Sequence, residues 1–366
     1  MAKKTYPYKP DTVTSPGATL KEIIDAKGMT QTELAERMDR PTKTISEIIH
    51  GKTQITSDTA VQLENVLGVP AEFWIKREGR YQEYLAKKEE QEVLEEQISL
   101  LDSLPMRDLR KRKFVSKTRD KVTQVKETLK FFGINHLTQV NKIYFQNCQY
   151  QFRKSNSYSV EKGHLAAWIR EGQIRADKVE TDSYSKSAFK GALEKIRHLS
   201  IEPPSVFEPK ISELCRNAGV AFVLVPQYEK CRTSGLARWL RPDKAMIQLS
   251  IRYKKDDHFW FSFFHEAAHI LKHSKKDTFL DDYKSSGEIS EIEQEANDFA
   301  ADFLIPSNEY KKLTNLNRIS KDDVRAFANA IGISPGIVVG RLQHDQVIPY
   351  TWMNGLKTTF EWTYDV

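Results

Sequence analysis

One short stretch of the chain has the residue types and spacing of a metal site. Its sequence is FFHEAAHILKH, beginning at Phe263, and it contains His265, Glu266 and His269. On a helix, residues four apart lie on one face with their Cβ atoms about 6 Å apart. Two imidazoles at that spacing can hold one zinc ion, and Glu266 can then act as a general base on a water beside it. A metal-dependent peptidase needs this arrangement.

The other faces of this stretch are apolar or small, so we predict a helix that is buried around the motif. Polar side chains in such a place are costly without a partner, and a metal ion would supply one. The alternative is a helix whose histidines only pack in the core. The apolar and small residues are Phe259, Trp260, Phe263, Phe264, Ala267, Ala268, Ile270 and Leu271.

A peptidase zinc takes three protein ligands and leaves one position open. His273 continues the face of the two histidines, but three ligands in one row on a helix do not surround an ion. We therefore place His273 behind the ligands or in the packing, and expect the third ligand elsewhere in the chain.

The best source of a third ligand is the stretch from Ser290 to Pro306, which predicts a second helix. Ser290 can cap that helix, with Glu293 completing a capping box. Glu291 and Glu295 lie one turn apart on one side of it. We favour Glu295 as the ligand over Glu291.

The segments HEAAHILKH and EQEANDFAADFLIP together resemble the ImmA/IrrE family of zinc metallopeptidases, over about Ile211 to Arg341. The resemblance implies a gluzincin-like domain that cuts or inactivates a DNA-binding repressor. It also implies a zinc site made of these residues: the ligands His265, His269 and Glu295, and the base Glu266.

Three short strands are predicted before the motif, at 220–225, 236–240 and 245–249. The stretch from Ser234 to Trp239 is our candidate to receive an extended substrate by strand addition, which would place Arg238 near the cleft. An additional donor should stabilise the oxyanion. Candidates for that role are Arg252, Tyr253 and His258, which lie just upstream of the motif.

The other end of the chain predicts a bundle of short helices from Leu20 to Trp74. TQTELAERM and the run that ends in Gly51-Lys52 resemble the XRE helix-turn-helix family, especially HigA-type antitoxins. Asp39 stands where that family usually has glycine. The alternative is a helical bundle that binds only protein. If the bundle reads DNA, the candidate contacts are Thr42, Lys43, Thr44, Ser46 and Lys52.

At 366 residues the chain should hold two or three domains. We predict a flexible arm at 1–18, a helix-turn-helix domain at 19–85 and a helical middle region at 86–205. A metallopeptidase domain at 206–345 and a C-terminal tail at 346–366 follow. The predicted fold class is multidomain, with an all-α N-terminal domain, a mostly helical middle region and an α+β gluzincin-like C-terminal domain.

Composition fits a protein of the cytoplasm. The three cysteines have no paired or metal-type spacing, which suits a reducing compartment. No apolar run is long enough to span a membrane. The net charge is a mild +6, yet residues 106–130 hold ten Lys or Arg against three Asp or Glu. That segment either neutralises phosphates or is a solvated helix face.

Two functions from different classes follow. The first is a DNA-binding transcriptional regulator with a zinc-dependent endopeptidase domain, cleaving a repressor, an antitoxin-type protein or itself. The second is a HigA-like antitoxin or repressor whose peptidase domain is a non-catalytic sensor. The expected cofactor is Zn²⁺. The expected partners are operator DNA, a helix-turn-helix protein substrate, a toxin and a second copy of the chain, with no membrane.

Overall fold

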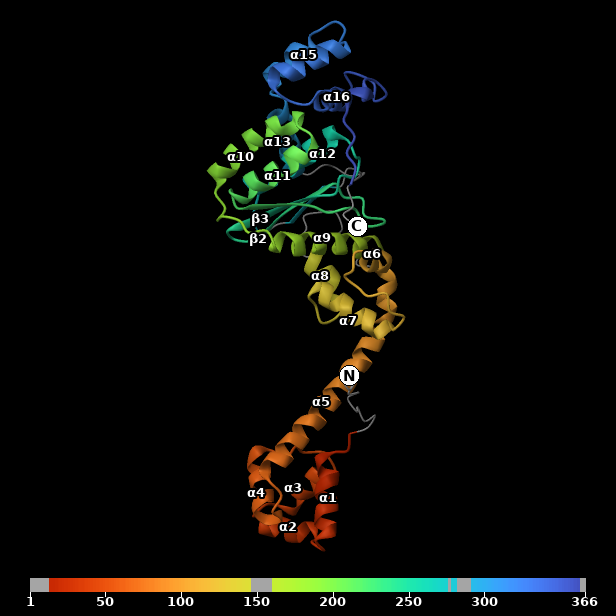
Figure 1. Cartoon of the computed structure of the whole chain (residues 1–366), viewed down its shortest axis with the longest axis vertical. Helices are drawn as coiled ribbons and strands as arrows, with labels where there is room; N and C mark the ends of the chain where they lie inside the picture. The colour runs from red at the N-terminus through yellow and green to blue at the C-terminus, as the bar shows by residue number, and fades with distance from the viewer. Residues whose placement is uncertain (1–12, 146–159, 276–277, 282–290, 363–366) are drawn as a thin grey trace, which may run out of the picture. The chain divides into compact units, whose positions relative to one another are not determined.

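The structure is a computed structural model, and it describes residues 13–145, 160–275, 278–281 and 291–362. The chain forms two compact units, Met1–Glu96 and Gln97–Val366 (Figure 1). The predicted fold class is confirmed: a helical N-terminal unit, many helices in the middle and a small mixed sheet with helices in the C-terminal part. Within the described residues, no helix is long and apolar enough to cross a membrane.

From residue 13 onward, the first unit is a bundle of five helices around one apolar core. Ser15, Thr30 and Thr56 each cap the N-terminus of the helix that follows, because each side-chain oxygen accepts a backbone N–H that has no partner inside the helix. The core is built from the apolar stripe of each helix. The helices are α1 (Pro16–Ala26), α2 (Gln31–Arg37), α3 (Thr42–Ile49), α4 (Ser57–Leu67) and α5 (Ala71–Glu96).

Two backbone details set the packing of this bundle. A Cβ on Gly17 would lie 1.9 Å from the carbonyl oxygen of Ile48, so α1 and α3 approach too closely there for any side chain. Asp39, in the turn between α2 and α3, has a φ of 50°. Glycine adopts that left-handed backbone at least cost, and Asp is among the few other residues that tolerate it.

The second unit begins with the helices of the predicted middle region. Asp120 caps α7, and Gly133 ends it with a φ of 68°, as is usual for a glycine after a helix. The helices are η1 (Ile98–Ser103), α6 (Met106–Lys111), α7 (Lys121–Phe132), α8 (Gln139–Phe145), α9 (Val160–Asp177), α10 (Lys186–His198), η3 (Leu199–Ile201) and α11 (Pro204–Arg216).

A four-stranded mixed sheet follows, with the order β1-β3-β2-β4. Its strands are β1 (Val220–Leu224), β2 (Gly235–Arg241), β3 (Lys244–Leu249) and β4 (Thr278–Asp281). β1 and β3 are parallel, whereas β2 is antiparallel to both of its neighbours. The first three agree with the predicted strands.

β2 pairs with β3 on one edge, and from Gly235 to Arg238 it pairs with β4 on the other, so this stretch has no open edge. Its main-chain N–H and C=O groups are therefore engaged within the sheet, and a substrate strand cannot add to it. The expectation that the stretch from Ser234 to Trp239 receives the substrate is wrong. Among the described strands, β4 is the outermost strand at the β2 end of the sheet, and its far edge is the one left open there.

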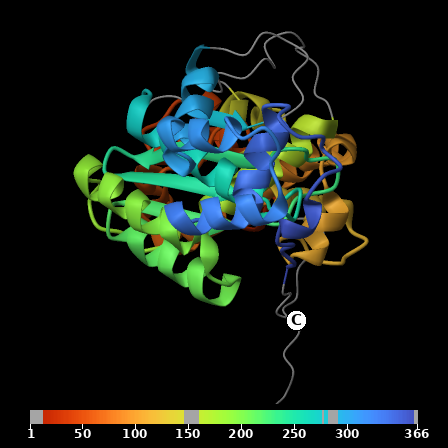
Figure 2. The same cartoon turned by 90° about the horizontal axis from the view of Figure 1, so that it is seen from above.

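Helices cover both faces of the sheet (Figure 1). Residues alternate along β3: Ala245, Ile247 and Leu249 join the core that contains α12, whereas Gln248 donates to the carbonyl of Trp168 in α9. Figure 2 shows the same layers from above. The remaining helices are α12 (Asp256–Lys272), α13 (Glu291–Leu304), α14 (Ser307–Thr314), α15 (Lys321–Ile331), α16 (Pro335–His344) and η4 (Asn354–Leu356).

The predicted domain boundaries at 205 and 345 both fall inside this one compact unit. The predicted tail is bound to the first turn of α12, because the Thr358 carbonyl accepts the N–H of Asp256 and the side chain of Phe360 lies in the core. Lys357 also forms an ion pair with Asp257.

Candidate metal centre and its surroundings

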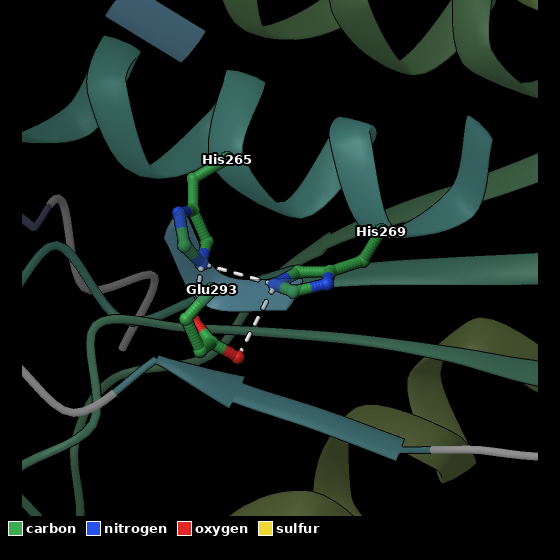
Figure 3. Close-up of side chains that lie close together, drawn as sticks. All are labelled: His265, His269 and Glu293. Atoms are coloured by element: carbon green, nitrogen blue, oxygen red, sulfur yellow. Dashed lines mark hydrogen bonds and ion pairs between the residues drawn. The ribbon is translucent and has the colours of Figure 1, made fainter. Parts of the chain in front are cut away.

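Two helices bring together the side chains of a candidate metal centre. His265 and His269 lie one turn apart on α12, and Glu293 reaches them from α13 (Figure 3). The two Nε2 atoms are 3.0 Å apart. The Glu293 carboxylate oxygens lie 3.2 Å from Nε2 of His265 and 3.6 Å from Nε2 of His269.

These distances fit a tetrahedral zinc ion. Atoms bound at about 2.0–2.1 Å to a tetrahedral zinc lie about 3.3 Å from one another. The three separations in this cluster, 3.0, 3.2 and 3.6 Å, lie on either side of that value. Two imidazoles and one carboxylate are also a usual donor set for a catalytic zinc with one open position.

The predicted third ligand, Glu295, does not reach the two histidines. The carboxylate that meets the histidines belongs to Glu293, whereas Glu295 has a side chain that is 50% exposed and pairs with Lys272 and His273. Two residues along a helix are about 200° apart around its axis, so Glu293 and Glu295 point in different directions.

A signal for Glu293 was present in the sequence. Ala296 and Ala300, the buried small residues of α13, are three and seven positions after it and therefore share its face. The capping role predicted for Glu293 depended on Ser290, which lies outside the described residues. Glu291, the other candidate, is exposed.

Neighbouring groups hold both histidines in the tautomer that a metal needs. Nδ1 of His265 donates to the side-chain oxygen of Asn297 at 3.0 Å, which leaves Nε2 as the acceptor. Nε2 of His273 lies 3.2 Å from the Glu295 carboxylate, and its Nδ1 lies 2.9 Å from Nδ1 of His269. The carboxylate can only accept, so His273 accepts in turn from His269. His273 and Glu295 thus lie behind His269, in the position of groups that support a metal ligand.

Electrostatics agree with a site ready for a cation. Burial lowers the pKa of His269 to about 4, so its imidazole is neutral near pH 7. Burial opposes ionisation of Glu293, but its contacts with His265 and His269 outweigh that effect and lower its pKa to about 2. Metal ligands need these protonation states, with neutral imidazoles and an ionised carboxylate.

Glu266 lies on the same helix as the two histidines and is fully buried. A Cβ on Gly235, the first residue of β2, would lie 2.4 Å from Oε1 of Glu266. Because glycine has no side chain, the start of β2 leaves space for the Glu266 carboxylate, and any other residue there would overlap it. Sequence reasoning about the motif gave no sign of this contact.

Of the remaining residues predicted near the cleft, Arg238 points away from it. Arg238 is on the face of β2 opposite to Gly235 and Ala237, because neighbouring strand residues point to opposite sides. Its charge acts on Tyr144 of α8, so the expectation that Arg238 lies at the cleft is wrong. Tyr253 stacks on His258 with ring centroids 4.3 Å apart. That stack lines a small surface pocket together with Arg252 and Ser262.

Comparison with known proteins agrees with both halves of this description. Residues 20–74 match the family described as helix-turn-helix, and residues 232–343 match the peptidase family described as IrrE N-terminal-like domain. The chain belongs to the helix-turn-helix family and carries an IrrE N-terminal-like peptidase domain. The second match contains both histidines and Glu293.

Two individual proteins are similar to parts of the chain. Virulence-associated protein A of Dichelobacter nodosus is 35% identical over 68 residues, which cover 18% of this chain and 67% of that protein. The other is a solved structure of an addiction module antidote protein of a HigA family from Coxiella burnetii. It is 29% identical, with a TM-score of 0.21, and covers 23% of this chain and 92% of that chain.

In the helix-turn-helix domain, the predicted DNA contacts lie on or just after α3. Thr42, Lys43 and Lys52 are exposed, whereas Thr44 and Ser46 are half-buried. The side chain of Lys43 is 85% exposed and lies 3.7 Å from Glu47, close enough for a weak ion pair. Arg40, in the turn before α3, pairs with Asp58 of α4 and so fixes the turn rather than the exposed face.

Proposed function

We propose that this protein is a DNA-binding transcriptional regulator whose IrrE-like domain is a zinc-dependent endopeptidase. The observation that supports the zinc site best is the convergence of His265, His269 and Glu293 at zinc-like separations. Glu266 adds a carboxylate from the same helix, one residue after the first ligand. The helix-turn-helix domain supports DNA binding.

The side chains suggest how a peptide would be cut. Zinc, when bound, supplies the Lewis acidity that polarises the scissile carbonyl and acidifies the attacking water. Glu266 takes a proton from that water and delivers it to the leaving amine. Because Gly235 closes off one side of Glu266, the carboxylate has little freedom to turn away from the ligands.

An extended substrate needs an open sheet edge beside the two histidines. β4 pairs with β2 on one side and packs beside α12, the helix that carries both of them. We propose that the outer edge of β4 binds the substrate main chain by strand addition. The substrate class implied by the family resemblance is a helix-turn-helix repressor, an antitoxin-type protein or the chain itself.

On the DNA side, α3 is the recognition helix in this proposal. Lys43 and Ser46 would meet base edges in the major groove, and Thr42 and Lys52 would meet phosphates. A second copy of the chain would supply the other half-site, as is common for helix-turn-helix proteins. A toxin partner stays a prediction from the resemblance to HigA-type antitoxins.

The test pairs zinc analysis with a cleavage assay. Wild type should hold one zinc ion per chain and cut a helix-turn-helix partner or itself. His265→Ala/His269→Ala should lose the zinc, whereas Glu266→Gln should keep the zinc and lose cleavage. A wild-type protein that binds its operator but neither holds zinc nor cuts would favour the second function, a repressor with a non-catalytic peptidase fold.

A further inference from the structure

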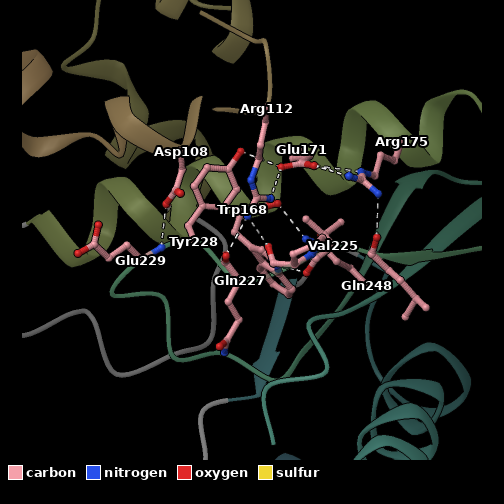
Figure 4. Close-up of polar contacts among 12 residues, drawn as sticks. Asp108, Arg112, Trp168, Glu171, Arg175, Val225, Gln227, Tyr228, Glu229 and Gln248 are labelled. Atoms are coloured by element: carbon pink, nitrogen blue, oxygen red, sulfur yellow. Dashed lines mark hydrogen bonds and ion pairs between the residues drawn. The ribbon is translucent and has the colours of Figure 1, made fainter. Parts of the chain in front are cut away.

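The loop that leads to Gly235 joins the middle region to the candidate base. This β1–β2 loop, residues 225–234, begins where β1 ends and runs directly into Gly235, which abuts Glu266. The contacts that fix this loop therefore also help to fix the position of Gly235 and the space that the Glu266 carboxylate occupies. The structure shows what holds the loop: Arg112, the residue just after α6, and side chains from α9, in the middle region (Figure 4).

Side chains from this region donate to consecutive main-chain carbonyls, from Leu224 at the end of β1 to Gln227 in the loop. Arg175 donates to the carbonyl of Leu224 at 3.0 Å, and the indole N–H of Trp168 donates to that of Val225 at 2.9 Å. Arg112 donates to the carbonyls of Pro226 at 2.9 Å and Gln227 at 2.8 Å. Side chains of the middle region thus satisfy the carbonyl groups that a neighbouring strand would satisfy in a sheet.

Arg112 is the centre of this set. Its guanidinium also pairs with Glu171 of α9 at 2.6 Å and lies 3.8 Å above the ring of Tyr228. The Glu171 side chain is only 1% exposed, and it also accepts from Arg175 and from the hydroxyl of Tyr228. Paired in this way, the buried carboxylate and the two arginines leave little freedom to the loop between them.

Hydrogen bonds continue from Arg112 to the far end of the loop. The side-chain amide of Gln227, whose own carbonyl Arg112 holds, donates to the carbonyl of Thr233 at 3.3 Å. Ser250, just after β3, donates to the carbonyls of Thr233 at 2.7 Å and Ser234 at 2.9 Å. The next residue is Gly235. Each step of the route from Arg112 to Glu266 is therefore a hydrogen bond, a peptide bond or a van der Waals contact.

We propose that Arg112 is a positioning residue for Glu266, acting through the β1–β2 loop and Gly235. On this proposal Arg112, although it belongs to the basic segment 106–130, does not contact phosphates, because its side chain turns inward to Glu171 and belongs to the peptidase. The inference rests on the proposed peptidase function. The middle-region helices then belong to the peptidase domain, because their side chains help to position its base.

The test compares Arg112→Lys with Arg110→Lys. A lysine at 112 keeps the charge but cannot hold Glu171 and two carbonyls with one planar fork. Arg110 is a matched control, because it lies in the last turn of α6, two residues before Arg112, and within the described part of the chain its guanidinium donates to the carbonyl of Met106 in that helix. Three quantities are measured on the full chain: zinc content, amide hydrogen exchange of residues 225–235, and kcat and KM for the substrate that wild type cleaves.

For Arg112→Lys we expect full zinc content, faster exchange in the β1–β2 loop and a kcat at least about tenfold lower, with little change in KM. Arg110→Lys should match wild type in all three. Unchanged kcat, unchanged loop exchange or loss of zinc in Arg112→Lys would each overturn the positioning role. Failure of the proposed function is a separate result, because wild type itself would then not cleave, while the loop exchange could still be read.

Discussion

At the scale of single residues, the candidate metal centre depends on which imidazole nitrogen of each histidine, and which glutamate carboxylate, faces it. Asn297 and His273 each hold the Nδ1 atom of one histidine, and both Nε2 atoms therefore point toward Glu293. Replacing a ligand and replacing its supporter should have different consequences. The ligand is one of three donors, whereas the supporter only fixes the orientation of a donor that stays in place.

Glu293 and Glu295 allow this difference to be measured. Glu293→Gln should lose most of its zinc, because a neutral amide is a poor replacement for the carboxylate in this site. Glu295→Gln should still bind one zinc ion per chain, with an affinity about 10–100-fold weaker. Competition with a fluorescent zinc chelator measures both. Equal losses in the two variants would contradict the assignment of Glu293 as ligand.

The protonation of His269 gives a second test, in metal-free protein. Its pKa is lowered to about 4 by burial, so the folded chain binds fewer protons than the unfolded chain between pH 6.5 and about 4. The metal-free second unit should therefore lose stability as the pH falls through that window. An NMR titration, with His269 assigned by comparison with His269→Gln, should show a midpoint near 4. A midpoint near 6.5 would mean that burial has little effect.

At the scale of elements, the site is made by a helix packed on a sheet. α12 crosses β2 where β2 begins with a glycine, and α13 packs on α12 so that one of its carboxylates meets the histidines. The side chains of α12 are buried on nearly every face over its length. Small shifts between these elements are resisted by close packing, which suits a site that needs fixed distances.

The contact between β2 and α12 predicts the effect of Gly235→Ala. The added methyl group would lie 2.4 Å from Oε1 of Glu266, and either the carboxylate or the strand must move. We expect cleavage to fall by at least about tenfold while zinc stays bound. Gly191→Ala is the control, because a methyl group in α10 meets nothing within 4 Å. A Gly235→Ala enzyme as fast as wild type would show that Glu266 is not held there.

At the scale of the whole molecule, two units with separate cores carry the two family matches. The cores share no residue: one belongs to the helix-turn-helix unit and the other to the sheet and its helices. Separate cores usually unfold separately, so a ligand of one unit should stabilise only that unit.

Thermal unfolding should therefore show two transitions, with zinc raising only that of residues 97–366. Gly17→Ala should lower only the other transition and weaken DNA binding, because its methyl group would overlap the carbonyl of Ile48 at a cost of about 1–3 kcal/mol. Gly79→Ala, in the open on α5, is the control. Calorimetry with and without zinc distinguishes these cases, and a single transition that shifts as a whole would contradict independent units.

Local patterns were enough to predict much of this protein. The placing of His265 and His269 on one face follows from helical geometry alone. The first three strands were predicted from their apolar, β-branched content. Each of these features is determined within a few residues of chain, where sequence distance and spatial distance agree.

Only the tertiary structure decided the features that join distant segments. Glu293 rather than Glu295 meets the histidines because of how α13 is rotated against α12. β2 lies inside the sheet because β4, some 40 residues later, pairs with its other edge. Arg112 turns inward because it pairs with Glu171 of α9 and donates to a carbonyl of the β1–β2 loop. Packing between elements sets these outcomes, and a pattern within one element does not contain that information.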